Sequence, residues 1–221
     1  MSLAHSESSI TPGLMAINTF TLKNPDTAAG FEEHFTSHVA FMRDQEGFLA
    51  HQMTRGDRSP ERYVNVGWWR APQDFGKVAQ SEEFQLHARS FHQLVDVEVT
   101  PSRSVHIHEA AGLVGEDSAD HPVVVVERFT VADPDADLAR RFIAYLATVP
   151  DGALAWAALG VSLPNPLLFT AVSRWRSVEA YEHAQTSAEF QALGQAATVT
   201  EEVSGSPVLA GRSAFVSAVR S

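Results

Sequence analysis

The stretch FTLKNPD at residues 20–26 recurs as FTVADPD at residues 129–135, and four of the seven letters are identical in register. In each copy a strand-like stretch runs into Asn or Asp, which is followed by Pro and Asp. Because Pro fixes its own φ and Asn or Asp caps helices, each copy predicts the end of a strand and the start of a helix. The chain therefore contains the same strand–turn–helix unit twice, about half its length apart.

Two further matches lie later in each half of the chain. WRAPQDF at residues 69–75 corresponds to WRSVEAY at residues 175–181, and SEEFQ at residues 81–85 corresponds to SAEFQ at residues 187–191. These pairs are 106 residues apart, whereas the first pair is 109 residues apart. We therefore expect the second copy to have lost three residues in between, in the helix-to-strand connection or in the hairpin turn.

The first half reads as a strand, a helix, two strands, a helical segment and a strand. Residues 14–22, 47–55 and 61–69 predict strands, and residues 96–110 predict an irregular strand that is interrupted at Pro101. The first helix is predicted by an apolar stripe at spacings of three and four residues, formed by Phe31, Phe35, Val39 and Met42. The second half repeats this order of elements.

A βαββαβ order forms a four-stranded antiparallel sheet with helices on one face. The other face carries apolar residues such as Ile17 and Val66, so it has to pack against a second layer. We therefore predict an α+β fold in which two tandem ferredoxin-like units form a pseudo-dimer of the dimeric α/β-barrel type. An alternative is that each copy pairs with another chain, as in a homodimer.

The repeat and the Gly-, Ser- and Asp-containing segment between its two copies predict the domain boundaries. We expect a flexible leader at residues 1–12, a first unit at residues 13–110, a linker at residues 111–120 and a second unit at residues 121–221. The linker prediction rests on the Gly, Ser and Asp residues of AAGLVGEDSADH.

Composition limits the classes of function. Apolar residues make up 44% and charged residues 19%, which is typical of a chain that folds around a core. The formal net charge is −11, which argues against binding to nucleic acid or to anionic membranes. The chain has no cysteine, so disulfides, thiolate metal sites and cysteine nucleophiles are excluded. No secretory pattern and no bilayer-spanning apolar run is present, so we expect a cytoplasmic protein.

Short motifs of the first half occur in a characteristic succession. An Asn in the first strand, GF after the first helix, WWRAPQDF after the third strand and SEEFQLH further on together resemble the antibiotic biosynthesis monooxygenase (ABM) superfamily. The resemblance extends over nearly the whole chain as two units and implies dimeric α/β barrels of ferredoxin-like units. That family includes cofactor-free oxygenases of polyketide anthrones and quinols, and also haem-degrading monooxygenases.

The resemblance implies particular site residues. The haem-degrading branch has an Asn on the first strand, a Trp on the short helix and a haem-ligating His nine residues after that Trp. Asn18 and His87 correspond to the first and the last of these, whereas Val78 stands at the Trp position. Since that Trp distorts the haem, its replacement bears on turnover more than on binding. In the cofactor-free branch, Asn and Trp help to hold the substrate oxygens.

The second copy departs from these markers. Glu127 corresponds to Asn18, and Leu193 corresponds to His87. A carboxylate and a leucine do not replace an amide donor and an imidazole. We therefore expect the active pocket in the first half and a degenerate scaffold in the second.

Three polar residues are the predicted catalytic groups. Asn18 interrupts an apolar strand and would donate to a substrate oxygen, whereas His87 or His38 would act as a base near neutral pH. His34 and His38 lie four residues apart on a helix, but without an identified third ligand no metal site is predicted. The predicted substrate-binding walls are Phe31, Phe35, Trp68, Val78 and Phe84.

Two neighbouring tryptophans end the third strand. Trp68 and Trp69 point to opposite faces, one towards the pocket and the other towards the barrel core. Tyr63 and Asn65 share the face of Trp69 and are further hydrogen-bonding candidates.

Three functions are compatible with these residues. The first is an oxygenase that oxidises a small aromatic or polyketide-like substrate, such as an anthrone or a quinol, with O₂ and without a cofactor. The second is a haem-binding or haem-degrading monooxygenase in which His87 is the ligand and Asn18 is the distal donor. The third is a non-catalytic small-molecule-binding protein on the same scaffold.

Overall fold

The computed structural model describes residues 12–108, 120–134 and 137–212. The predicted leader and linker lie outside these ranges, apart from Pro12 and Asp120. No helix in the described part of the chain is long and apolar enough to cross a membrane.

The first half begins with the strand and turn of the first repeat. Its elements are β1 (Leu14–Leu22), the 3-10 helix η1 (Pro25–Thr27), α1 (Ala28–Arg43), β2 (Phe48–Gly56), β3 (Arg62–Trp69), α2 (Pro72–Ala79), α3 (Glu82–Leu94) and β4 (Val95–His108). The side chain of Asn24 accepts a hydrogen bond from the amide of Asp26 at 3.0 Å, and Pro25 occupies the first turn. The Asn-Pro-Asp motif therefore starts the helical segment as predicted.

The second half repeats these elements with a shorter first helix. They are β5 (Val123–Val131), α5 (Leu138–Leu146), β6 (Leu154–Ser162), β7 (Leu168–Trp175), α6 (Val178–Gln185), α7 (Ala188–Ala196) and β8 (Ala197–Arg212). Helix α5 has 9 residues against 16 in α1, whereas the β2–β3 and β6–β7 hairpin turns are equally long. The three-residue loss therefore falls in the first helix and its connections and not in the hairpin turn.

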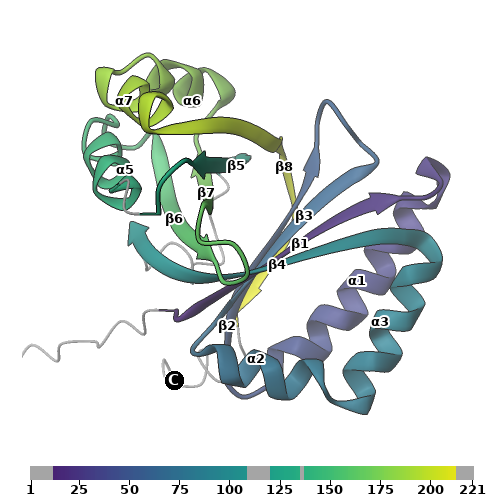
Figure 1. Ribbon diagram of the computed structural model, residues 1–221. Helices are drawn as coiled ribbons and strands as arrows, with labels where there is room; N and C mark the ends of the chain where they lie inside the picture. The colour runs from purple at the N-terminus through teal and green to yellow at the C-terminus, as the bar shows by residue number, and fades with distance from the viewer. Residues whose placement is uncertain (1–11, 109–119, 135–136, 213–221) are drawn as a thin grey trace, which may run out of the picture.

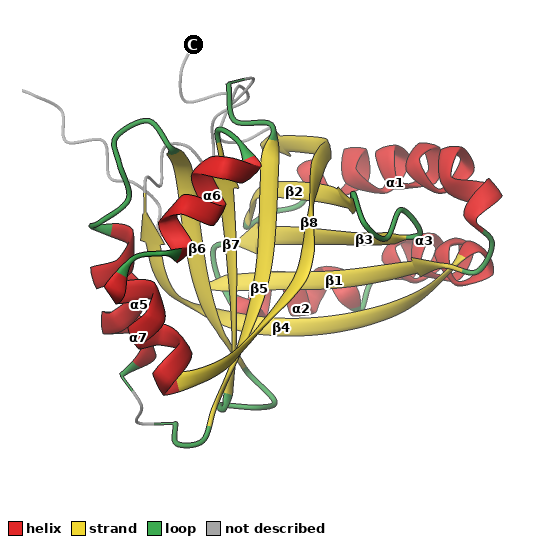
Figure 2. Cartoon of the chain, turned by 90° about the horizontal axis from the view of Figure 1, so that it is seen from above, coloured by secondary structure: helices red, strands yellow, loops and turns green. Residues whose placement is uncertain are grey.

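The eight strands of the described residues form one closed antiparallel barrel in the order β1-β3-β2-β8-β5-β7-β6-β4. Each half contributes four neighbouring strands in ferredoxin-like order, and the halves join where β2 pairs with β8 and β4 pairs with β6. The helices of the two halves cover opposite sides of the barrel (Figure 1 and Figure 2). The predicted α+β fold of two tandem ferredoxin-like units is therefore confirmed.

Alternate residues of each strand face either the barrel interior or the helices. In the interior, Met15 and Ile17 of β1 pack with Trp68 of β3 and Trp156 of β6, and the two indole rings meet edge-to-face at 5.5 Å. On the other face, Phe20 packs against aromatic side chains of α1 and α3. The first-half sheet thus separates the barrel core from a second buried layer beneath its own helices.

Strand β4 continues through Pro101, where the sequence predicted an interruption. The Pro101 carbonyl accepts a hydrogen bond from the amide of Leu163 at 2.9 Å, just beyond the end of β6. Pro101 lies one residue beyond Ser102, the last residue of β4 paired with β6, so its missing N–H removes no bond from that ladder. The register of β4 shifts between Ser104 and His106 instead.

Candidate active site

A pocket of about 430 Å³ lies between the first-half sheet and its helices, a size typical of small-molecule sites. The strands contribute Ala16, Asn18, Phe20, Phe48, His51, Asn65, Gly67, Trp69, Val97 and Val99. The helices contribute Phe35, His38, Val39, Met42, Phe75, Ala79, Phe84, Gln85, Ala88, Phe91 and His92. Among these described lining residues there is no Asp, Glu, Lys or Arg.

Two amide side chains form the polar centre of the sheet surface. Asn18 of β1 stands directly opposite Asn65 of β3 in the antiparallel register, and both side chains line the pocket. Residues paired in this way have their Cβ atoms roughly 5 Å apart, so one ligand can contact both. Each amide offers both donors and an acceptor, which suits a ligand that carries carbonyl or phenolic oxygens.

Asn65 also contacts a buried histidine on the neighbouring strand. The Nδ1 atom of His51 on β2 lies 3.3 Å from the Oδ1 atom of Asn65. The Nε2 atom of His51 is buried and has no hydrogen-bond partner in the described protein. Since a buried nitrogen without a partner is costly, this atom is a candidate contact for a ligand.

His38 of α1 lies across the pocket from the sheet. Its ring meets Phe91 edge-to-face at 5.2 Å and Phe84 at 5.6 Å, and the ring of His87 lies 5.5 Å away. The Nδ1 atom of His38 is buried without a hydrogen-bond partner in the described protein. The pocket therefore contains two imidazoles that each have a buried nitrogen without a hydrogen-bond partner in the described protein.

Both imidazoles are held in the neutral form. Burial lowers the pKa of His38 to about 4, and repulsion from His87 and His51 adds to the effect. Burial also lowers the pKa of His51 to about 4, with a contribution from Arg43, although the hydrogen bond with Asn65 acts in the opposite direction. At neutral pH the pocket thus presents uncharged imidazoles that are able to accept a proton or a hydrogen bond.

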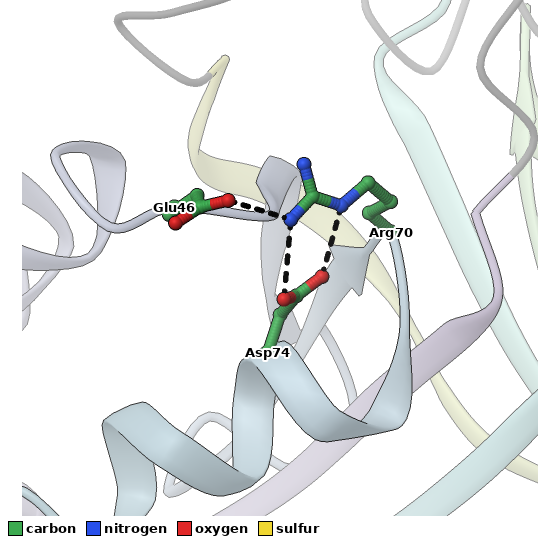
Figure 3. A network of polar contacts seen from close by, with 3 residues as sticks. All are labelled: Glu46, Arg70 and Asp74. Carbon is green, nitrogen blue, oxygen red and sulfur yellow. Dashed lines mark hydrogen bonds and ion pairs between the residues drawn. The ribbon is translucent and has the colours of Figure 1, made fainter.

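The WRAPQDF motif builds one end of the pocket. Arg70 donates two hydrogen bonds to Asp74, at 3.1 and 3.2 Å, and a third to Glu46 at 3.0 Å (Figure 3). Gly47 has a φ of +85° and lies against Asp74, where a Cβ atom would overlap the carboxylate. This network ties the first turn of α2 to the segment before β2 and so places Phe75 at the pocket.

The pocket contains half of the predicted site residues. Asn18, His38, Phe35 and Phe84 line it. His87, Phe31, Trp68 and Val78 do not line it. Phe31 and Val78 lie one layer further from the pocket: Phe31 packs against Phe35 at 6.0 Å, and Val78 belongs to the apolar cluster around Trp69. They support the walls and do not form them.

The prediction that Trp68 walls the pocket was wrong. Trp68 is 1% exposed and points into the barrel interior, whereas Trp69 lines the pocket. Strand alternation requires only that the two rings point to opposite faces, and it does not say which face lies inside the barrel. Because Trp69 shares its face with Asn65, which pairs with Asn18, the pocket side is the side of Trp69.

His87 does not have the position of a haem ligand. Its ring stacks on Phe41 at 5.2 Å on the outer side of His38, and it is not among the residues that line the pocket. A ligand to haem iron has to project from the pocket wall towards the bound group. The residues therefore do not fit a haem that is held by His87 in this pocket, and we derive no haem-dependent step.

His51 is a site residue that the sequence analysis did not identify. It lies two residues before Met53, which faces the helices, so the two side chains share one face of β2. An isolated polar residue on the helix-facing side of a buried strand was the available signal. The sequence marks its partner Asn65 only as a further hydrogen-bonding candidate.

The second half lacks these polar groups. In register, the positions of Asn18, His51 and Asn65 are occupied by Glu127, Ala157 and Ala171. Glu127 is 3% exposed, and its carboxylate accepts a hydrogen bond from Tyr181 at 2.8 Å. The space between sheet and helices is occupied by apolar side chains that include Phe142 and Tyr145.

Residues 13–90 match the model of the antibiotic biosynthesis monooxygenase family. This part of the chain is therefore similar to an ABM domain, and the match includes all the pocket residues on β1, β2 and β3. No curated protein matches the sequence.

Solved structures of similar architecture span both halves of the chain. An anthrone oxidase-like protein is 17% identical, with a TM-score of 0.71 over 94% of this chain and 96% of its own. A putative monooxygenase from Fusobacterium nucleatum is 10% identical, with a TM-score of 0.74 over 91% and 95%. One from Lactobacillus acidophilus is 11% identical, with a TM-score of 0.67 over 92% and 97%. At these identities the likeness establishes the fold.

Proposed function

We propose that this protein is a monooxygenase of the ABM type that oxidises a small aromatic or polyketide-like substrate, such as an anthrone or a quinol, with O₂ and without a cofactor. The observation that carries the proposal is the composition of the first-half pocket. Opposed amides of Asn18 and Asn65, unpartnered imidazole nitrogens and aromatic walls lie together there. These groups suit a flat ring that carries phenolic or carbonyl oxygens.

The chemistry of an anthrone defines what the protein has to supply. Removal of a proton from the ring CH₂ group gives an electron-rich anion, which passes one electron to O₂. Recombination of the two radicals forms the C–O bond of a peroxide anion. After this anion is protonated, the O–O bond breaks and the second ring proton is lost, which yields a carbonyl and water. The protein therefore needs a base, donors to the developing oxyanion and a dry pocket.

Each requirement has a candidate in the pocket. The amides of Asn18 and Asn65 donate hydrogen bonds to the oxyanion of the deprotonated ring. The rings of Trp69, Phe35 and Phe84 hold the flat substrate and exclude water. A neutral pocket histidine accepts the proton.

Oxygen uptake with anthrone tests this proposal. We expect the protein to accelerate O₂ consumption above the spontaneous rate, to form anthraquinone, and to incorporate one atom of ¹⁸O₂ into the new carbonyl. The Asn18→Ala variant should lose most of this acceleration. If O₂ consumption with the protein is no faster than in buffer alone, for both anthrone and a quinol, the proposal is contradicted. Saturable binding of anthraquinone without turnover would then favour the non-catalytic binding protein.

A further inference from the structure

The contact between His51 and Asn65 also indicates which nitrogen of the His51 ring carries the proton. An amide oxygen only accepts hydrogen bonds, so the Nδ1 atom of His51, 3.3 Å from the Oδ1 atom of Asn65, carries the proton. In a neutral imidazole the other nitrogen then has a free lone pair. That nitrogen, Nε2, is buried in a residue that lines the pocket and has no partner in the described protein.

Apart from the Asn65 amide, whose hydrogen bond favours the charged ring, the surroundings of His51 oppose a positive charge on it. His38 lies on the helical wall of the same pocket, with His87 beyond it, and Arg43 ends α1. No Asp or Glu is among the described residues that line the pocket. His51 is therefore neutral at physiological pH, and among the described residues the group hydrogen-bonded to it is an uncharged amide.

We propose that His51 is the acid–base residue of this pocket and that Asn65 is the residue that positions it. The Nε2 atom takes the proton from the substrate, while the Nδ1–H bond to the Asn65 carbonyl keeps the ring in place. The imidazolium then returns the same proton to the terminal oxygen of the peroxide anion, which restores neutral His51. Two electrons pass from the substrate to O₂ as the hydroperoxide forms, and two more when the O–O bond breaks and the second ring proton is lost, so no other oxidant is needed. This assignment rests on the proposed oxygenase function.

His51 fits this role better than the two histidines predicted from the sequence. His87 is outside the pocket and stacks on Phe41. His38 lines the pocket, but its ring is packed among aromatic rings and its Nδ1 atom has no partner in the described protein that would select one tautomer. Of these three histidines, His51 alone has one ring nitrogen next to an acceptor and the other buried without a partner in the described protein, which suits a general base.

The tautomer of His51 can be measured without any turnover. A long-range ¹H–¹⁵N correlation spectrum of the labelled protein at pH 7, assigned with His51→Gln, should show His51 protonated at Nδ1 and unprotonated at Nε2. In Asn65→Ala this preference should disappear. A proton on Nε2, or a charged His51 ring at pH 7, would overturn the proposal even if the protein proved to be an oxygenase.

Kinetics with anthrone test the role itself. We expect His51→Gln to lower kcat by about 10²–10⁴-fold with a small change in KM, whereas His34→Gln, on the exposed side of α1, should behave as wild type. The wild-type rate should be level between pH 6 and 8, and the variant rate should rise with pH as hydroxide replaces the base. A variant with a parallel pH profile and an unchanged kcat would overturn the assignment.

A binding probe separates this proposal from the proposed function. The visible absorption of 1,8-dihydroxyanthraquinone shifts when a phenolic proton is drawn towards a base. We expect a saturable red shift with wild type and binding without this shift in His51→Gln. If wild type shows the shift but no O₂ uptake, the proposed oxygenase function is wrong, whereas the role of His51 as proton acceptor is supported. If both proteins bind the probe with the same spectrum, His51 is not the proton acceptor.

Discussion

Asn18 and Asn65 lie opposite each other on β1 and β3, on the one face of the barrel wall that borders the pocket. The same β3 residue also bonds His51 on the next strand. Three neighbouring strands therefore bring their isolated polar side chains together in one otherwise apolar surface. A ligand that contacts Asn65 is within reach of the other two groups.

Loss of Asn18 should affect the oxidation of the substrate and leave the fold intact. If its amide donates to the oxyanion, Asn18→Ala should lower kcat/KM for anthrone by about 10²–10³-fold, the usual cost of removing one such donor. Glu127→Gln, at the corresponding position of the second half, is the matched control and should leave kcat/KM unchanged. Equal losses in the two variants would show that the effect is not specific to the first-half pocket.

Gly67 should be required to keep the pocket open. In the second half the corresponding residue is Ser173, whose hydroxyl accepts a hydrogen bond from the indole nitrogen of Trp175 at 2.8 Å. A Cβ atom on Gly67 would lie 3.5 Å from the Trp69 Nε1 atom, so the backbone accommodates Gly67→Ser. The new hydroxyl should bind the indole and occupy the pocket floor, which should weaken binding of anthraquinone at least several-fold while thermal stability is retained. Fluorescence titration measures this change.

The reverse exchange in the second half is the control for Gly67. Ser173→Gly removes the partner of Trp175 and should cost roughly 1 kcal/mol of unfolding free energy. It should not change the affinity for anthraquinone. A change in affinity would mean that the second half contributes to the ligand site.

Gly47 should be indispensable for the Arg70–Asp74 network. Its φ of +85° disfavours any L side chain, and a Cβ atom there would displace the Asp74 carboxylate. We expect Gly47→Ala to lower the unfolding free energy by about 2 kcal/mol or more. Gly76→Ala, on α2 where a Cβ atom meets nothing within 4 Å, should instead raise it by up to about 1 kcal/mol. Urea unfolding of both variants tests the contrast.

The buried histidines should make stability depend on pH. His38 and His51 have a folded-state pKa of about 4, below the value of 6.5 for an unperturbed histidine, so the unfolded state binds more protons. Their contribution is complete above pH 6.5 and is lost as the pH falls towards 4, by roughly 2 kcal/mol per histidine at pH 5. A His38→Gln/His51→Gln double variant should lose less stability than wild type between pH 7 and pH 5. Identical pH slopes in urea unfolding would contradict this.

Much of the fold could be predicted from local signals. The Asn-Pro-Asp turn of the first half, the apolar stripe of α1 and the order of elements all reappear in the structure, because turn chemistry and periodicity act over short distances. The tandem architecture followed from the need to cover the second face of each sheet. Pro101 was misread, since its tolerance depends on where the partner strand β6 ends, and no local pattern contains that information.

The site was predictable only in part, because tertiary structure decides which side of a strand borders the pocket. Asn18 and His38 line the pocket as expected, since a polar residue in a strand or on a helix stripe is visible in the sequence. Trp68 was placed on the wrong face, because alternation leaves two choices. His51 and Asn65 gain their importance from a contact across 14 residues, which only the pairing of β2 with β3 creates.

Within a single polypeptide, β2 pairs with β8 and β4 pairs with β6. The two halves of the barrel can therefore acquire different substitutions during evolution. In an assembly of two identical subunits every substitution appears twice, so a residue that spoils one cavity spoils both. Here position 127 is glutamate, whereas the corresponding position 18 is asparagine. Such a barrel can keep a ligand pocket in one half while side chains fill the corresponding space in the other half. We therefore expect it to bind one ligand per barrel.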